Sequence, residues 1–117
     1  MSLASTVHEQ VANLTGFNLG FLLAKAKPDK ATAALAYADQ VIAAPDAATL
    51  QAVLDMVLPT LHDPAIGGLI LYNVSQLSAI LGMNLLGVNV LVDAAAVPLV
   101  KAAAVGFKAG VATALPK

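Results

Sequence analysis

Two short segments, GFNLG at residues 16–20 and GFKAG at residues 106–110, place paired glycines inside stretches that otherwise favour helix. A glycine inside a helix costs about 1 kcal/mol relative to alanine, so two such pairs need a compensating contact. Glycines four residues apart share one helix face, and their missing side chains let another backbone approach closely. We therefore predict a close helix contact, between subunits slightly more than within one chain, at Gly16, Phe17, Gly20, Gly106, Phe107 and Gly110. The alternative is a helix that is loosened or broken at these glycines.

The spacing of the apolar residues predicts an all-α protein, a single-domain bundle of about five helices over residues 1–117. A chain of this length is long enough to bury one core. The expected helices span residues 2–27, 29–43, 46–61, 64 to between 82 and 87, and 98–114. Residues 87–93 are compatible with an extended segment, a loop or the start of the last helix.

Capping residues and prolines set the expected helix boundaries. Asp46 can cap or enter the third helix, and Pro59 should kink or end it because proline lacks the amide hydrogen. Asp63 followed by Pro64 is a favoured helix start, and Pro98 favours a kink or a new start.

Apolar stripes indicate which helix faces should be buried. In the first helix the residues at three- and four-residue steps are Leu3, Val7, Val11, Leu14, Phe17 and Phe21. In its second half Leu19, Leu22 and Leu23 join from other faces, so this half should be buried nearly all round. In the third helix they are Leu50, Val53, Leu54, Val57, Leu58 and Leu61, opposite Gln51 and Asp55. We predict that the stripe of the third helix belongs to the core. Alanines at 31, 34 and 38 in the second helix leave room for a close neighbour.

The composition has more apolar and fewer charged residues than an ordinary globular protein. Apolar residues make up 59% and charged residues 11% of the chain, and alanine accounts for 25 of the apolar residues. The remaining apolar residues predict a surface that is buried against another copy or a helical partner. Six lysines against seven carboxylates leave a net charge of -1, which argues against a nucleic acid partner.

The candidate chemistry is sparse. His8 and His62 are each followed by an acid, but adjacent helix residues point about 100° apart and cannot hold one ion from one face. The chain has no cysteine and no phosphate-binding glycine motif, and its serines lack a nucleophile setting. We therefore expect no enzyme, no catalytic residue, no metal site and no cofactor.

Residues 64–92 contain no charged side chain, and the run is long enough to cross a membrane. Against this, it carries several polar residues and lacks flanking anchors. Its amides Asn73, Gln76, Asn84 and Asn89 either bond within a buried seam or line an exposed helix face.

Three functions follow, in order of preference. The first is a non-enzymatic interaction or self-assembly module, with a homo-oligomer or a helical protein as partner. The second is a membrane-inserting or membrane-associated helical protein, and the third is a carrier that holds an apolar ligand between its helices. The start MSLASTVHEQ lacks the features of a signal peptide, and the localisation stays open.

Overall fold

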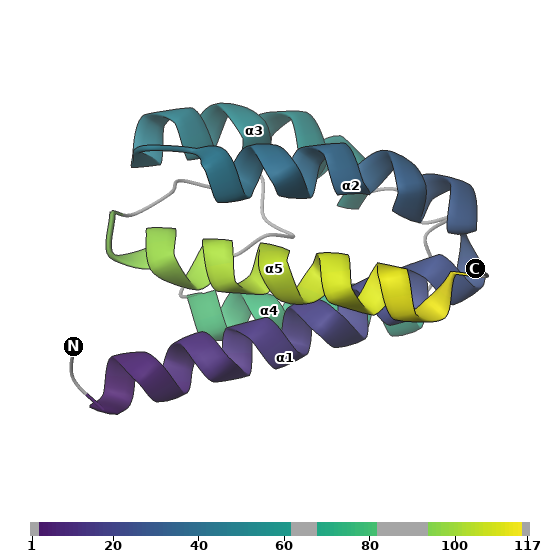
Figure 1. The fold of residues 1–117 in the computed structure, drawn as a ribbon, viewed down its shortest axis with the longest axis horizontal. Helices are drawn as coiled ribbons and strands as arrows, with labels where there is room; N and C mark the ends of the chain where they lie inside the picture. Colours follow the sequence, from purple (N-terminus) through teal and green to yellow (C-terminus); the bar gives the residue numbers. More distant parts are fainter. Residues whose placement is uncertain (1–2, 62–67, 82–93, 116–117) are drawn as a thin grey trace.

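The computed structural model describes residues 3–61, 68–81 and 94–115, and this part of the chain folds into five α-helices and one short 3-10 turn (Figure 1). The helices are α1 (Leu3–Ala26), α2 (Pro28–Ala43), α3 (Ala47–Leu61), α4 (Gly68–Leu81) and α5 (Val97–Ala114), and the 3-10 turn η2 (Ala94–Ala96) precedes α5. The prediction of an all-α bundle of about five helices is confirmed.

The helices form two layers. Helices α1, α4 and α5 lie together, and α2 and α3 lie side by side over α5 (Figure 1). The most extensive contact joins α1 to α5, which run in the same direction although they stand at opposite ends of the described chain. The radius of gyration of 13.1 Å matches the value of about 13 Å expected for a compact domain of this size.

Two prolines lie at helix starts, where the loss of an amide hydrogen costs least. Pro28 is the first residue of α2, and Pro98 is the second residue of α5. Helix α3 continues two residues past Pro59, so this proline stands in its last turn. The expected start at Asp63 and Pro64 and the segment 87–93 lie outside the described residues.

The start of α3 is capped as expected. The backbone N–H of Thr49 donates a hydrogen bond to Asp46 Oδ1 at 2.8 Å, and the N–H of Leu50 donates to the Asp46 carbonyl oxygen at 3.1 Å. The Thr49 hydrogen bonds favour the charged carboxylate and lower the pKa of Asp46 below its usual value. Residue 46 therefore fixes where the third helix begins.

The buried face of α1 differs from the predicted stripe. Val7, Val11 and Leu14 are 47%, 40% and 61% exposed. Small residues are buried instead, together with two leucines: Ala12, Thr15, Gly16, Leu19, Gly20, Leu23 and Ala24. The reason is the contact with α5, which is too close to accommodate large side chains. The expected burial of Leu19 and Leu23 is confirmed. Apolar spacing alone did not identify the small residues of this face because both faces of α1 carry apolar residues.

Helix α3 buries the start of its predicted stripe. Leu50 and Val53 are buried, whereas Leu54 and Val57 are half-buried. On the polar side, Gln51 Nε2 donates a hydrogen bond of 3.0 Å to Asp55 Oδ1. The core assignment therefore fits Leu50 and Val53 fully and Leu54 only in part. The side chains of Leu58 and Leu61 are beyond what the structure describes.

Candidate functional site

The four paired glycines lie in one contact between α1 and α5, which we call the glycine seam. A methyl group on Gly16 or Gly20 would come closer than 3.0 Å to the backbone of Ala103 or Phe107. A methyl group on Gly106 or Gly110 would meet the backbone of Asn13 or Phe17 just as closely. The two helices therefore touch backbone to backbone, which only glycine permits at these four positions.

The glycine seam is nearly symmetric. Gly16 meets the residue three before Gly106, and Gly106 meets the residue three before Gly16. Gly20 and Gly110 repeat this relation one turn further on. The repeated G-F-x-x-G segment thus gives each parallel helix the same small face at the same height. This geometry explains why the segment occurs twice in the sequence.

The expected close helix contact is present, and it lies within one chain. The sequence slightly favours a contact between subunits, but in the structure the other helix of the same chain fills the space beside all four glycines. A hydrogen bond of 3.1 Å from Asn13 Nδ2 to the Ala102 carbonyl oxygen also crosses this contact. The glycines therefore stabilise the fold and position the residues around them.

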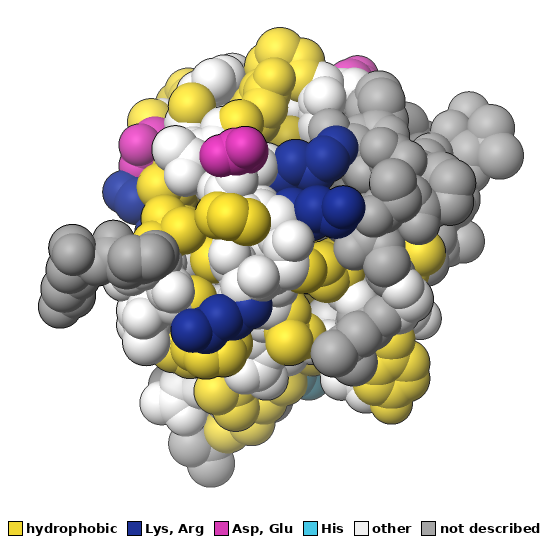
Figure 2. All heavy atoms as spheres, turned by 90° about the vertical axis from the view of Figure 1, so that its right-hand side faces the viewer, with side chains coloured by type: hydrophobic (Ala, Val, Ile, Leu, Met, Phe, Trp, Pro, Cys, Tyr) yellow, Lys and Arg dark blue, Asp and Glu magenta, His cyan; other side chains and the backbone are white. Residues whose placement is uncertain are grey.

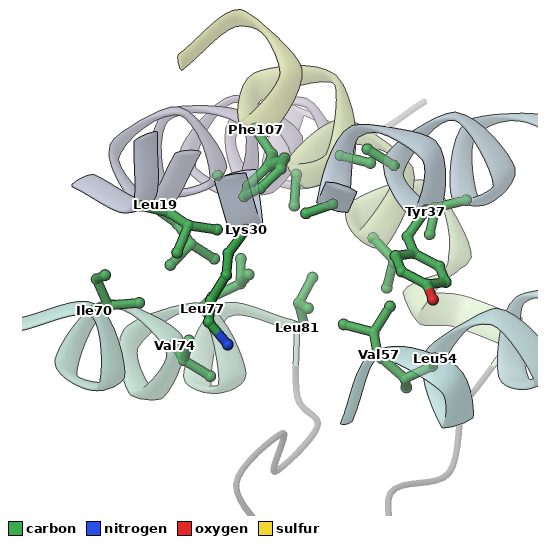
Figure 3. A pocket seen from close by; sticks show the side chains of 18 residues that line it. Leu19, Lys30, Tyr37, Leu54, Val57, Ile70, Val74, Leu77, Leu81 and Phe107 are labelled. Carbon is green, nitrogen blue, oxygen red and sulfur yellow. The ribbon is translucent and has the colours of Figure 1, made fainter. Parts of the chain in front are cut away.

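The two phenylalanines beside the glycines, Phe17 and Phe107, lie in different surroundings. Phe17 is half-buried, and its ring stacks on that of Phe21 with centroids 6.4 Å apart. The ammonium group of Lys25 lies 5.5 Å from the centre of the Phe21 ring, a cation–π distance. Phe107 instead lines a cavity (Figure 3).

This cavity lies between the two layers of helices. Its volume is about 170 Å³, it is partly open to solvent, and all five helices contribute to its wall (Figure 3). Its lining residues are Gly16, Leu19, Leu23, Lys30, Ala34, Tyr37, Ala38, Val41, Leu54, Val57, Ile70, Val74, Leu77, Leu81, Val100, Ala103, Ala104 and Phe107. We call this space the apolar cavity.

The wall of the apolar cavity carries two polar side chains, Lys30 and Tyr37, both on α2. In Figure 3 the Lys30 side chain extends from α2 in the direction of α4, and the Tyr37 hydroxyl lies on the side of Leu54 and Val57. Among the residues that the structure describes, no carboxylate lines the cavity. The space is therefore suited to an apolar molecule.

The spacing of residues along the sequence does not indicate the residues of this cavity. The expected space for a close neighbour along α2 is only partly filled, because Ala31 and Ala38 are buried whereas Ala34 is half-buried and faces the cavity. Lys30, Ala34, Tyr37 and Val41 recur at three- and four-residue steps, so their shared face was visible in the sequence. The distance between α2 and the layer of α1, α4 and α5 cannot be read from the sequence.

The end of the molecule where α1 ends and α2 begins carries charges of both signs. In Figure 2, lysine and acidic side chains are scattered among apolar side chains on this end. Residues 25–30, KAKPDK, supply three lysines and one aspartate to this junction. Farther along α2, Asp39 forms an ion pair with Lys108 of α5. The pair links the two layers at an exposed site, where such pairs contribute little.

The titratable residues form no metal-binding group in the part of the chain that the structure describes. His8 is exposed on α1, and His62 lies outside the described ranges.

Helix α4 covers the described part of the uncharged run, Gly68–Leu81. Gln76 is exposed and its Nε2 donates a hydrogen bond of 2.8 Å to the Tyr72 hydroxyl, so this amide lines a surface. Asn84 and Asn89 fall in the range that the structure leaves undescribed.

Helix α5 is long and apolar enough, by length and composition, to cross a membrane. Within the fold, its glycine face instead packs on α1, and Ala103, Ala104 and Val111 are buried. These contacts account for part of its apolar composition, since 39% of the helix is buried within the fold.

No protein-family model, curated protein sequence or solved structure matches this chain.

Proposed function

We propose that the protein binds an apolar small molecule in the apolar cavity, as a carrier rather than as an enzyme. The cavity of about 170 Å³ carries this proposal. Well-packed cores have few voids larger than a water molecule. A space of this size is costly to leave empty, and a natural ligand would supply the missing contacts.

The size and chemistry of the cavity support a small apolar ligand. An apolar cavity of about 150 Å³ stays dry and binds benzene. Here the volume is slightly larger and the opening leaves a route for entry. Val74 and Leu77 of α4 face Leu19 of α1 across it, and Phe107 adds an aromatic wall (Figure 3).

The test is calorimetric titration with 1-octanol, a neutral probe. We expect one saturable site on the natural protein. Ala34→Leu should weaken this binding at least about tenfold, because the larger side chain fills the space that the probe needs. The same change should raise the free energy of unfolding by about 0.5 to 2 kcal/mol, as cavity-filling substitutions commonly do.

Ala33→Leu is the matched control. Residue 33 lies in the same helix turn but is exposed, so this variant should bind 1-octanol as the natural protein does. Equal binding by all three proteins would place the probe elsewhere and reject the cavity as the site. Absence of binding to the natural protein would reject the proposed function.

A second candidate function is self-assembly through α1, the function that the sequence favours first. The exposed stripe of Val7, Val11 and Leu14 lies on one face of α1, at the edge of the molecule (Figure 1). Neighbouring exposed apolar side chains of this kind mark interaction surfaces. A helix-to-helix contact between two copies is the arrangement that fits a straight stripe at three- and four-residue steps.

Light scattering on the natural protein and on Leu14→Gln tests this second candidate. We expect a dimer that becomes a monomer in the variant, because the substitution removes the most exposed residue of the stripe without touching the core. Ala33→Leu again serves as the control, since it changes an exposed site on another helix. A natural protein that stays monomeric at high concentration would rule this candidate out.

A further inference from the structure

We infer that the ligand of the apolar cavity carries one uncharged oxygen, as an alcohol or carbonyl group, which forms a hydrogen bond with the Tyr37 hydroxyl. The hydrocarbon part of the ligand then lies among the apolar side chains. This inference rests on the proposed function, which by itself requires only an apolar molecule.

Tyr37 places a hydroxyl in a wall that is otherwise almost entirely hydrocarbon. In the described part of the chain, the lining residues other than Tyr37 and Lys30 are apolar side chains and one glycine. Lys30 is exposed and already has an interaction of its own within the protein, so the inference makes no use of it. Tyr37 is therefore the residue that we expect to bind a polar group of the ligand.

The Tyr37 hydroxyl is available for such a bond. Tyr37 is half-buried, and among residues 3–61, 68–81 and 94–115 its hydroxyl has no hydrogen-bond partner. It lies on the side of Leu54 and Val57, whose side chains offer neither a donor nor an acceptor (Figure 3). The Tyr72 hydroxyl differs, because it accepts a hydrogen bond of 2.8 Å from Gln76 Nε2. A phenol both donates and accepts, so an alcohol or a carbonyl oxygen can bind to it.

The apolar wall selects against the two alternatives to an uncharged oxygen. A charged group that enters an apolar space loses its hydration, and one phenol does not compensate for that loss. A pure hydrocarbon that displaces water from Tyr37 would leave the hydroxyl without a partner. An uncharged oxygen loses less hydration than an ion, and it restores the hydrogen bond of the phenol.

The cavity also gives the hydrocarbon part a place to extend. Ala34 and Ala38 line the cavity beside Tyr37, where their small side chains leave space. From Tyr37 the lining side chains continue to Val74 and Leu77 of α4 (Figure 3). A ligand with its oxygen at Tyr37 therefore directs its chain toward α4. 1-Octanol, with one uncharged oxygen at the end of a chain, has this form.

The experiment compares 1-octanol with benzene, a hydrocarbon probe, on the natural protein and on Tyr37→Phe, with unfolding curves to confirm that the variant folds. Phenylalanine keeps the aromatic ring and removes only the hydroxyl. We expect Tyr37→Phe to weaken 1-octanol binding about fivefold, the effect of one neutral hydrogen bond, and to leave benzene binding unchanged. The two affinities are measured by calorimetric titration.

Tyr72→Phe is the matched control, because it removes the same atom from an exposed tyrosine that does not line the cavity. This variant should bind both probes as the natural protein does. If 1-octanol binds but Tyr37→Phe leaves its affinity unchanged, the hydrogen-bond inference is wrong and the proposed function stands. Equal weakening of both probes by Tyr37→Phe would assign the effect to the shape of the cavity and would also overturn the inference. If neither probe binds the natural protein, both proposals fail.

Discussion

Replacing Gly106 by alanine should destabilise the protein, although alanine is the better helix former. The added methyl group would lie too close to the Asn13 backbone, so α1 must move away from α5. Overpacking at such a site costs about 1 to 3 kcal/mol, more than the gain in helix preference of about 1 kcal/mol. Chemical denaturation should therefore show a lower free energy of unfolding, and Gly106→Leu should lower it further.

Gly68→Ala is the matched control for this prediction. A methyl group at residue 68, the exposed first residue of α4, would meet nothing within 4 Å. This variant should be as stable as the natural protein or slightly more stable. The loss in Gly106→Ala should also be the same at low and high protein concentration, because the seam is within one chain. A loss that grows on dilution would place the contact between subunits.

The second large effect is expected for Leu50→Ala. Leu50 is 1% exposed in α3, so its truncation removes fully buried atoms and leaves a void. Such substitutions lower the free energy of unfolding by about 2 to 5 kcal/mol. Denaturation in urea, with unchanged slope, is the measurement.

Leu54→Ala, four residues further along the same helix, should lower the free energy of unfolding by less, about 1 to 2 kcal/mol. Leu54 is half-buried and already borders the apolar cavity, so fewer contacts are lost and the space merely becomes larger. The sequence alone predicts a full core loss at Leu54, and the structure revises it. A larger loss at Leu54 than at Leu50 would mean that α3 packs differently from this account.

The helices and the glycine seam could be predicted because both depend on local spacing. Pro28 and Pro98 mark helix starts, Asp46 marks the cap of α3, and paired glycines at four-residue steps mark a close contact. Whether this contact joins two helices of one chain or of two chains depends on the path of the intervening residues. Local spacing does not predict the path of those residues.

The face of α1 and the cavity could not be predicted for a related reason. Periodicity favoured the larger side chains of Val7, Val11 and Leu14 as the buried face, whereas packing on α5 selected the small ones. The cavity lies where α2 and α3 do not pack tightly against the layer of α1, α4 and α5. It therefore depends on distances between helices. Its polar residue Lys30 looks like any solvated lysine in the sequence.

The most direct test of the proposed function is to locate 1-octanol on the natural protein by intermolecular nuclear Overhauser effects. We predict contacts from the probe's methylene groups to the methyl groups of Val74, Leu77 and Leu19, which face one another across the cavity (Figure 3). These contacts should disappear in Ala34→Leu. Contacts to Val7, Val11 and Leu14 instead, with none inside the cavity, would contradict the account and favour α1 as the functional surface.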